Sequence, residues 1–189
     1  TGGFIDWRGS LIRFDLSEIL SGSEILEAKL FLYHYSAWGE QISIHRMLKN
    51  WTELGATWSE PCVGCELWGQ GWSEGNYVRS PTFSQRVTQV SRWFSWDVTE
   101  DVRTFLSGTP NYGWFLKSAQ TTCTDATSTS FYSRNSKHTR LRPYLQVRFR
   151  NALHPLTVKI TSPVDGTVVS TISLTGTGTG SDSTAMVAV

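Results

Sequence analysis

The sequence predicts an all-β protein: an antiparallel β-sandwich, jelly-roll-like, with one short helix. Many short segments alternate between apolar and polar residues, as half-buried strands do. Clusters of Gly, Ser, Asn and Pro separate these segments, as turns separate the strands of a sandwich. The chain has 189 residues, 39% hydrophobic and 13% aromatic. This is enough apolar material for the packed core of one domain of ordinary size.

The strand signals run along most of the chain. The longest lies in residues 28–35, where Ala28, Leu30 and Leu32 share one face and aromatic residues share the other. The predicted strands are residues 11–16, 28–35, 42–45, 88–90 continuing into 93–96, 114–116, 131–133 and 144–149.

One segment has helical spacing instead. Between Val98 and Leu106 the apolar residues recur at i, i+4, i+7 and i+8, which predicts a short helix. We expect Thr99 to cap its start and Gly108 to end it. Its apolar stripe is expected to pack over one end of the sandwich.

Composition excludes some classes of function. The 17 cationic and 16 acidic residues nearly cancel, which argues against a dedicated nucleic-acid-binding protein. No apolar run approaches the roughly 20 residues that a membrane span needs. The abundance of Trp, Gly, Ser and Thr with modest charge favours a secreted or cell-surface, extracellular protein.

The cysteines are odd in number: Cys62, Cys65 and Cys123. The Cys62-Val-Gly-Cys65 spacing lacks both the second ligand pair of a zinc site and the βαβ setting of a redox site. A structural disulfide is favoured, either across the short gap or to Cys123. Asn50-Trp51-Thr52 is a sequon, which makes Asn50 a glycosylation candidate.

The composition changes near Asn151, and no aromatic residue follows Phe149. We therefore predict a β-sandwich over residues 1–150, a linker over residues 151–156 and a separate β segment over residues 157–189.

Several motifs, taken in order, resemble the DNRLRE domain, which is also classed as carbohydrate-binding module family 96 and is related to disaggregatases. The matching stretches are Arg13-Phe14-Asp15-Leu16-Ser17, Ala28-x-Leu30-x-Leu32, Asn50-Trp51-Thr52-Glu53-x-x-x-Thr57-Trp58, Trp96-Asp97-Val98-Thr99, Asn111-Tyr112-Gly113, Phe131-x-Ser133 and Arg142-Pro143-Tyr144-Leu145. The resemblance implies a non-catalytic antiparallel sandwich of secreted or cell-surface proteins, often implicated in glycan binding. The stretch from Ile160 to Gly176 resembles the start of a bacterial Ig-like domain.

No pattern indicates catalysis. The four histidines show no ligand spacing, no Gly-x-Ser-x-Gly elbow occurs, and nothing marks a pair of carboxylates. We predict that the chain is not an enzyme and needs no cofactor, with a structural calcium ion left open.

The aromatic residues are the better signal, because Trp and Tyr rings stack on the C–H faces of sugars. The candidates for glycan binding are Tyr33, Tyr35 and Trp38, on or beside the strand face opposite the core, and Trp68, Trp72 and Tyr77 in a Gly-rich loop expected to expose them. Packing and subunit contacts are the alternatives for both groups.

Charge is segregated along the chain. Residues 134–150 hold six cations and no acid, whereas residues 53–74 hold four acids and no cation. The basic strip, with Arg140 and Arg148 as candidates, would suit an acidic polysaccharide such as a uronate polymer. Two alternatives stay open: contact with the acidic loop of a neighbouring subunit, and an ordinary solvated surface.

The leading hypothesis is a secreted, non-catalytic glycan-binding module whose partner is a polysaccharide. The alternative is a structural subunit of an extracellular filament or surface layer. In that case residues 157–189 would supply a strand to a neighbouring subunit, so that the chain assembles by strand exchange.

Overall fold

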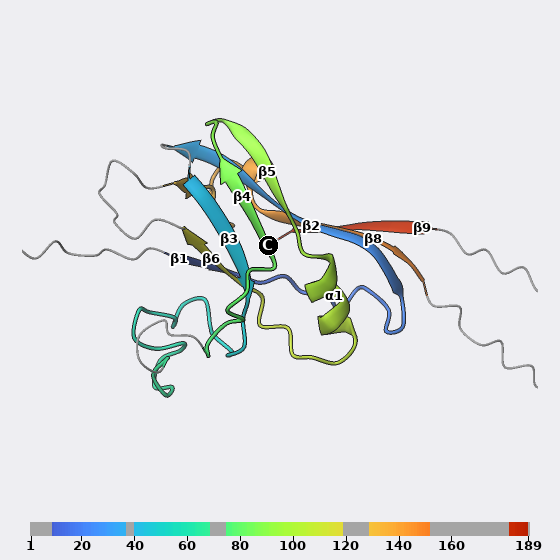
Figure 1. Cartoon of the computed structure of the whole chain (residues 1–189), viewed down its shortest axis with the longest axis horizontal. Coiled ribbons are helices and arrows are strands. Elements are labelled where there is room, and N and C mark those ends of the chain that lie inside the picture. Colours follow the sequence, from blue (N-terminus) through green and yellow to red (C-terminus); the bar gives the residue numbers. More distant parts are fainter. Residues whose placement is uncertain (1–8, 37–39, 69–74, 119–128, 152–181, 189) are drawn as a thin grey trace, which may run out of the picture.

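The computed structural model describes residues 9–36, 40–68, 75–118, 129–151 and 182–188. In this part of the chain, two antiparallel sheets pack face to face and one α-helix lies at their edge (Figure 1). The all-β sandwich predicted from the sequence is confirmed.

Sheet A has four strands, and every pairing in it is antiparallel. In spatial order the strands are β1 (Gly9–Ile12), β6 (Trp114–Ser118), β3 (Glu40–Arg46) and β4 (Phe83–Val87). Leu116 lies opposite Ile44 and Trp114 lies opposite Ile12, so apolar side chains from three strands share the inner face.

Sheet B is centred on the long strand β2. In spatial order its strands are β5 (Arg92–Asp97), β2 (Glu24–Ser36), β8 (Tyr144–Arg150) and β9 (Asp182–Ala188), and β7 (Ser130–Phe131) pairs with the end of β2. β9 runs antiparallel to β8 within the same chain, from Tyr144 opposite Ala188 to Arg150 opposite Asp182. Residues 152–181, with most of the predicted linker and the Ig-like motif, lie outside the described residues.

The core fills the space between the two sheets. Leu30 and Leu145 from sheet B face Ile44 and Trp114 from sheet A, and all four are fully buried. The indole Nε1 of Trp96 donates a hydrogen bond of 3.1 Å to the carbonyl oxygen of Ile42. A buried polar group is thereby satisfied across the two layers.

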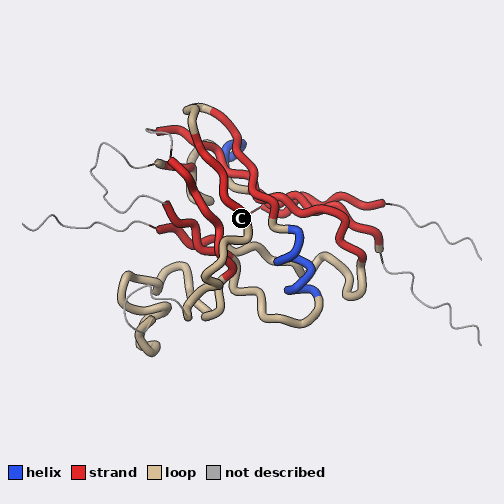
Figure 2. The backbone as a smooth tube through the Cα atoms, viewed as in Figure 1, coloured by secondary structure: helices blue, strands red, loops and turns tan. Residues whose placement is uncertain are grey.

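The predicted helix is present as α1 (Thr99–Leu106), and it packs against β2 at one end of the sandwich (Figure 2). Val102 and Phe105 are buried in the main core, as the helical spacing predicts. The predicted cap is wrong, because Thr99 is already helical. Asp97 instead accepts hydrogen bonds from the backbone N–H and the hydroxyl of Thr99, at 2.9 and 2.6 Å.

Several strand boundaries differ from the prediction, and β4 is not among the predicted strands. Residues 88–90 form no strand, because they carry the chain from β4 in sheet A to β5 in sheet B and so have no neighbouring strand. Residues 13–16 also lack a strand partner, although Phe14 and Leu16 are buried as their alternation predicts.

Candidate functional site

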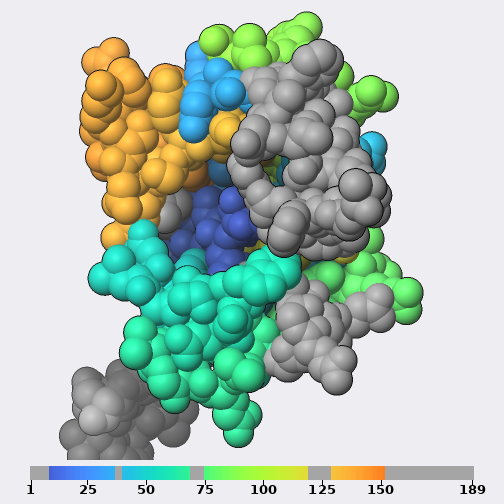
Figure 3. Space-filling view, turned by 90° about the vertical axis from the view of Figure 1, so that its left-hand side faces the viewer, coloured from blue at the N-terminus to red at the C-terminus, as the bar shows by residue number. Residues whose placement is uncertain are grey.

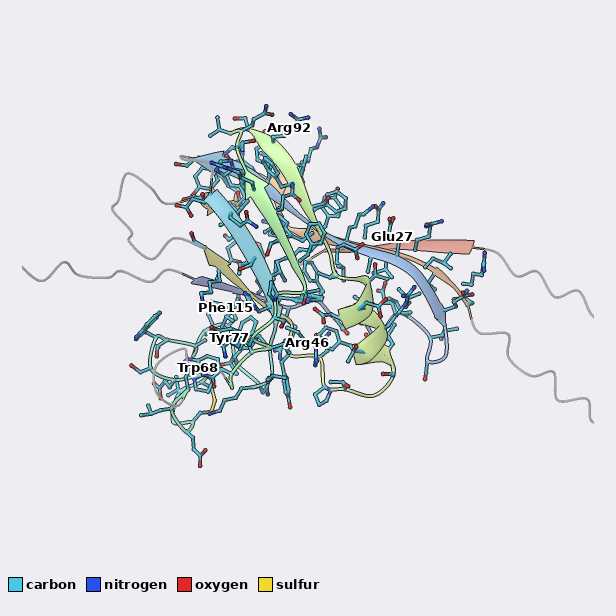
Figure 4. The ribbon with its side chains drawn as sticks, in the orientation of Figure 1. Glu27, Arg46, Trp68, Tyr77, Arg92 and Phe115 are labelled. Atoms are coloured by element: carbon cyan, nitrogen blue, oxygen red, sulfur yellow. A yellow bond between two sulfur atoms is a disulfide. The ribbon has the colours of Figure 1, made fainter. Side chains whose placement is uncertain are left out.

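The loop between β3 and β4 covers the outer face of sheet A. Trp68 and Tyr77 of this loop pack with Phe115 of β6 in a second apolar cluster (Figure 4). Trp68 is 2% exposed and Tyr77 is 6% exposed. Their predicted exposure is therefore wrong.

The physical reason for this burial lies in contacts within the loop and with sheet A. The indole Nε1 of Trp68 donates a 2.9 Å hydrogen bond to the carbonyl oxygen of Thr57, and the Tyr77 and Phe115 ring centroids are 5.1 Å apart. A large aromatic side chain with a satisfied polar atom is stable inside such a cluster. Trp72, the third candidate of this loop, lies outside the described residues.

The outer face of sheet B, in contrast, carries a continuous group of aromatic side chains, which we call the aromatic platform. Successive side chains of a strand point to opposite faces, so the residues of β2 that alternate with Leu30 and Leu32 face outward. The platform comprises Phe31, Tyr33 and Tyr35 of β2, Trp93 of β5, Tyr132 next to β7, and Tyr144 of β8.

The rings of the platform support one another. Phe31 stacks on Tyr144 with centroids 4.7 Å apart, and Trp93 meets Tyr144 edge-on at 5.1 Å. Tyr33 meets Trp93 edge-on at 5.3 Å. Offset-stacked and edge-to-face pairs are the preferred arrangements of aromatic rings, so these side chains hold their positions without a ligand.

The platform rings are only partly buried, and Tyr35 is 45% exposed. Burial raises the pKa of the Tyr144 hydroxyl above its ordinary value of 10.0. The predicted outward orientation of Tyr33 and Tyr35 is confirmed, whereas Trp38 lies outside the described residues.

Four platform residues were not among the candidates taken from the sequence: Phe31, Trp93, Tyr132 and Tyr144. The alternation of their strands could have placed Phe31, Trp93 and Tyr144 on outward faces. That these faces belong to one surface depends on the strand register, which brings Trp93 opposite Tyr33 and Tyr144 opposite Phe31.

The two predicted arginines differ in their relation to the platform. Arg148 is exposed and lies on the same face of β8 as Tyr144, four residues further along. Arg140 is exposed in a short 3₁₀ turn, η2 (Thr139–Leu141), before that strand. The strand geometry therefore brings Arg148, but not Arg140, onto the platform face.

Part of the basic strip contacts acidic residues of the same chain. Arg134 lies 3.0 Å from Glu53 of the acidic loop, and Arg150 lies 3.3 Å from Glu24. The sequence left open a contact between these oppositely charged segments of neighbouring subunits. One such pair forms inside a single chain.

A cleft of about 960 Å³ opens between the two sheets at the end opposite α1. Figure 3 shows this hollow between the orange segment that precedes β8 and the loop after β3, with blue β1 residues at its base. Its floor contains Leu32, Ile42 and Leu116, and Trp58 and Tyr132 line its sides.

Arg13 is held at the cleft by two neighbours. Its Nη1 donates a 2.9 Å hydrogen bond to Oδ1 of Asn50, and its guanidinium lies 5.2 Å from the ring centroid of Trp51. The Trp51 Nε1 donates in turn to the carbonyl oxygen of Tyr112 at 2.7 Å. This chain of contacts joins three of the motif stretches quoted above.

Other motif residues have structural roles. Asn111 donates through Nδ2 to the carbonyl oxygen of Phe14 at 2.8 Å and accepts from the Gly113 N–H at 3.0 Å. Gly113 has a φ of +71°, and a Cβ there would come within 2.2 Å of the Ile12 carbonyl oxygen. Only glycine fits this position without a shift of the backbone.

Cys62 and Cys65 form a disulfide across the short gap, which decides between the two predicted pairings of these residues. Cys123 lies outside the described residues. Asn50 is exposed, as a glycosylation site must be, and its modification stays a prediction. Within the described ranges, no group of three or more His, Cys, Asp or Glu lies together in a way that could hold a metal ion.

Comparison with known proteins supports the resemblance drawn from the motifs. Residues 6–66 match the family model of carbohydrate-binding module family 96. No curated protein gives a significant match. The helix found in the described segments is too short and too polar to cross a membrane. Over residues 6–66 the chain is therefore similar to carbohydrate-binding modules of this family, and the sandwich fold agrees with that similarity.

Proposed function

We propose that this chain binds a polysaccharide on the aromatic platform of sheet B, as a non-catalytic module of an extracellular protein. The observation that carries the proposal is the gathering of six partly exposed aromatic side chains on one sheet face. Sugar rings offer C–H faces that pack on such rings, and tyrosine hydroxyls exchange hydrogen bonds with sugar hydroxyls.

The contrast between the two sheets supports the choice of surface. The β3–β4 loop covers aromatic residues on the outer face of sheet A, such as Phe115, whereas the platform rings of sheet B stay partly exposed. The platform is also preorganised by its ring contacts, which lowers the entropy lost when a ligand binds.

An acidic polysaccharide fits the charges beside the platform. Arg148 projects from the platform face of β8, and a guanidinium pairs well with the carboxylate of a uronate residue. Arg140 lies before β8 and would add a second cation along an extended chain.

Retention in native gels that contain polysaccharide tests the proposal. We expect Tyr33→Ala and Trp93→Ala each to weaken retention about tenfold, the size of effect that loss of one buried aromatic contact has at an interface. Phe83→Ala is the matched control, because Phe83 is an exposed aromatic residue of β4 in sheet A. Equal retention of all three variants and the unchanged protein would reject the platform.

The same gels test the charge of the ligand. We expect a uronate polymer to be retained more strongly than a neutral glucan, and its retention to fall with added salt because salt screens the charges of Arg148 and Arg140. Arg148→Gln should reduce retention of the uronate polymer alone. A preference for the neutral glucan would reject the acidic ligand and leave the platform in place.

A further inference from the structure

We propose that the cleft between the sheets is a second sugar subsite, which takes one uncharged pyranose ring at the end of a glycan chain. The inference rests on the proposed carbohydrate-binding function, and it adds a site with its own polar group. Four observations on described residues carry it.

The polar group is the carboxylate of Glu40, the first residue of β3. Glu40 is 3% exposed and lines the cleft, and its Oε1 has no hydrogen-bond partner in the structure. A buried carboxylate oxygen without a donor lowers stability, since its hydration is lost without replacement. A sugar hydroxyl would supply the donor that this oxygen lacks.

The floor of the cleft suits the other part of a sugar ring. Leu32, Ile42 and Leu116 present apolar surface, against which the C–H face of a pyranose can pack. Trp58 and Tyr132 add aromatic surface at the sides. A carboxylate that accepts hydroxyls, next to apolar walls, is the combination that a neutral pyranose needs.

Arg13, Arg134 and Lys117 also line the cleft, but the position beside the Glu40 carboxylate favours an uncharged ring over a uronate. The Arg134 guanidinium is paired with Glu53, and that of Arg13 is tied to Asn50 and Trp51. A uronate would bring a second negative charge toward buried Glu40, where the lower dielectric strengthens repulsion. The cleft and the platform are therefore expected to prefer different residues of one glycan.

The cleft is continuous with the platform. Tyr35 and Tyr132 line the cleft and also belong to the platform, and their rings stack with centroids 4.6 Å apart. A glycan whose terminal ring occupies the cleft can leave it over these two rings and continue along sheet B. This arrangement predicts recognition of a chain end in addition to binding along the chain.

The test follows the indole N–H signals of the full chain by nuclear magnetic resonance. Trp58 reports on the cleft and Trp93 on the platform, and Trp58→Phe and Trp93→Phe assign the two signals. The probes are short cello-, xylo- and manno-oligosaccharides. We expect at least one probe to shift the Trp58 signal, and Glu40→Gln and Glu40→Met to weaken that response about tenfold or more, as loss of hydrogen bonds to a charged group does.

The melting temperatures of Glu40 variants test the role of this residue without any added sugar. Because Glu40 has an unsatisfied buried oxygen, Glu40→Met should raise the melting temperature while it removes binding in the cleft. Glu18→Gln, at an exposed glutamate outside the cleft lining, should change neither property. A lower melting temperature in both Glu40 variants would identify Glu40 as a structural group and overturn the subsite.

The two Trp signals separate the outcomes. A shift of Trp93 alone would reject the cleft and support the platform. A shift of Trp58 alone would support the cleft and would show that the platform does not bind neutral glycans, which leaves the platform to the uronate test. A Trp58 shift that persists in both Glu40 variants would overturn the role of Glu40. If no probe moves either signal, both sites are rejected for neutral glycans.

Discussion

The indole Nε1 of Trp114 donates a 2.7 Å hydrogen bond to Oδ2 of Asp101, which joins β6 of sheet A to helix α1. The same carboxylate accepts from the Thr82 hydroxyl at 2.5 Å, and its Oδ1 lies 3.3 Å from Nε of Arg46. One buried side chain thus connects the helix to two strands and to the loop before β4.

We expect substitutions of Asp101 to destabilise the fold through this network. Asp101→Ala leaves the Trp114 N–H and the Arg46 guanidinium without their acceptor, which costs about 3–5 kcal/mol for a buried charge pair. Asp101→Asn keeps one oxygen and should cost less. Urea unfolding measures both, with Glu100→Ala as the control, because the carboxylate of Glu100 is exposed. Equal effects of Asp101→Ala and Glu100→Ala would contradict this account.

Truncation of two tryptophans of the same loop should reduce stability by very different amounts. Trp68→Ala removes a side chain that is 2% exposed, which costs about 3–5 kcal/mol in a packed cluster. Trp58→Ala removes one that is 52% exposed, which should cost about 1 kcal/mol or less. Thermal unfolding compares the two, and a similar loss of stability in both would show that the loop is packed differently.

The difference between Trp58 and Trp68 also marks the limit of what the sequence predicts. The alternation in β2 correctly separates Leu30, in the core, from Tyr33, on the outer face. Periodicity along the strand is enough to predict burial in β2, since burial there depends on which face of the sheet a side chain occupies. The loop has no such period, and its burial depends on contacts with Phe115, far away in the chain. The cleft around Glu40 likewise forms only when the two sheets meet.

The pKa of His45 gives a pH dependence of known sign. Burial lowers it from its ordinary value of 6.5, and the positive charge of Lys117 adds to this effect. As the pH falls below about 6.5, the unfolded chain takes up a proton that the folded chain does not. The free energy of unfolding should therefore decrease toward acid, by at most about 1.4 kcal/mol per pH unit for one group, until the folded pKa is reached.

His45→Gln isolates this contribution. We expect the variant to lose stability less steeply than the unchanged chain between neutral pH and the lowered pKa, because glutamine does not titrate. Urea unfolding at a series of pH values measures both slopes. The imidazole accounts for none of the acid sensitivity if the two slopes coincide.

The pairing of β9 with β8 makes strand exchange between chains testable. The pairing is antiparallel over Asp182–Ala188, and consecutive N–H groups of a strand point to opposite sides. Replacing Ala185 and Met186 together by proline must therefore remove one N–H that faces β8. The edge of β8 should then be exposed in an otherwise intact full chain, ready to accept an identical strand from outside.

We expect a labelled peptide of residues 182–188 to bind this double variant in fluorescence anisotropy, and to bind the unchanged chain much more weakly because β9 occupies its own edge. The same peptide carrying both prolines is the control. Saturable binding of the first peptide alone would support assembly by strand exchange. If the double variant binds neither peptide, β9 pairs with β8 only as part of the same chain, and the filament alternative loses its mechanism.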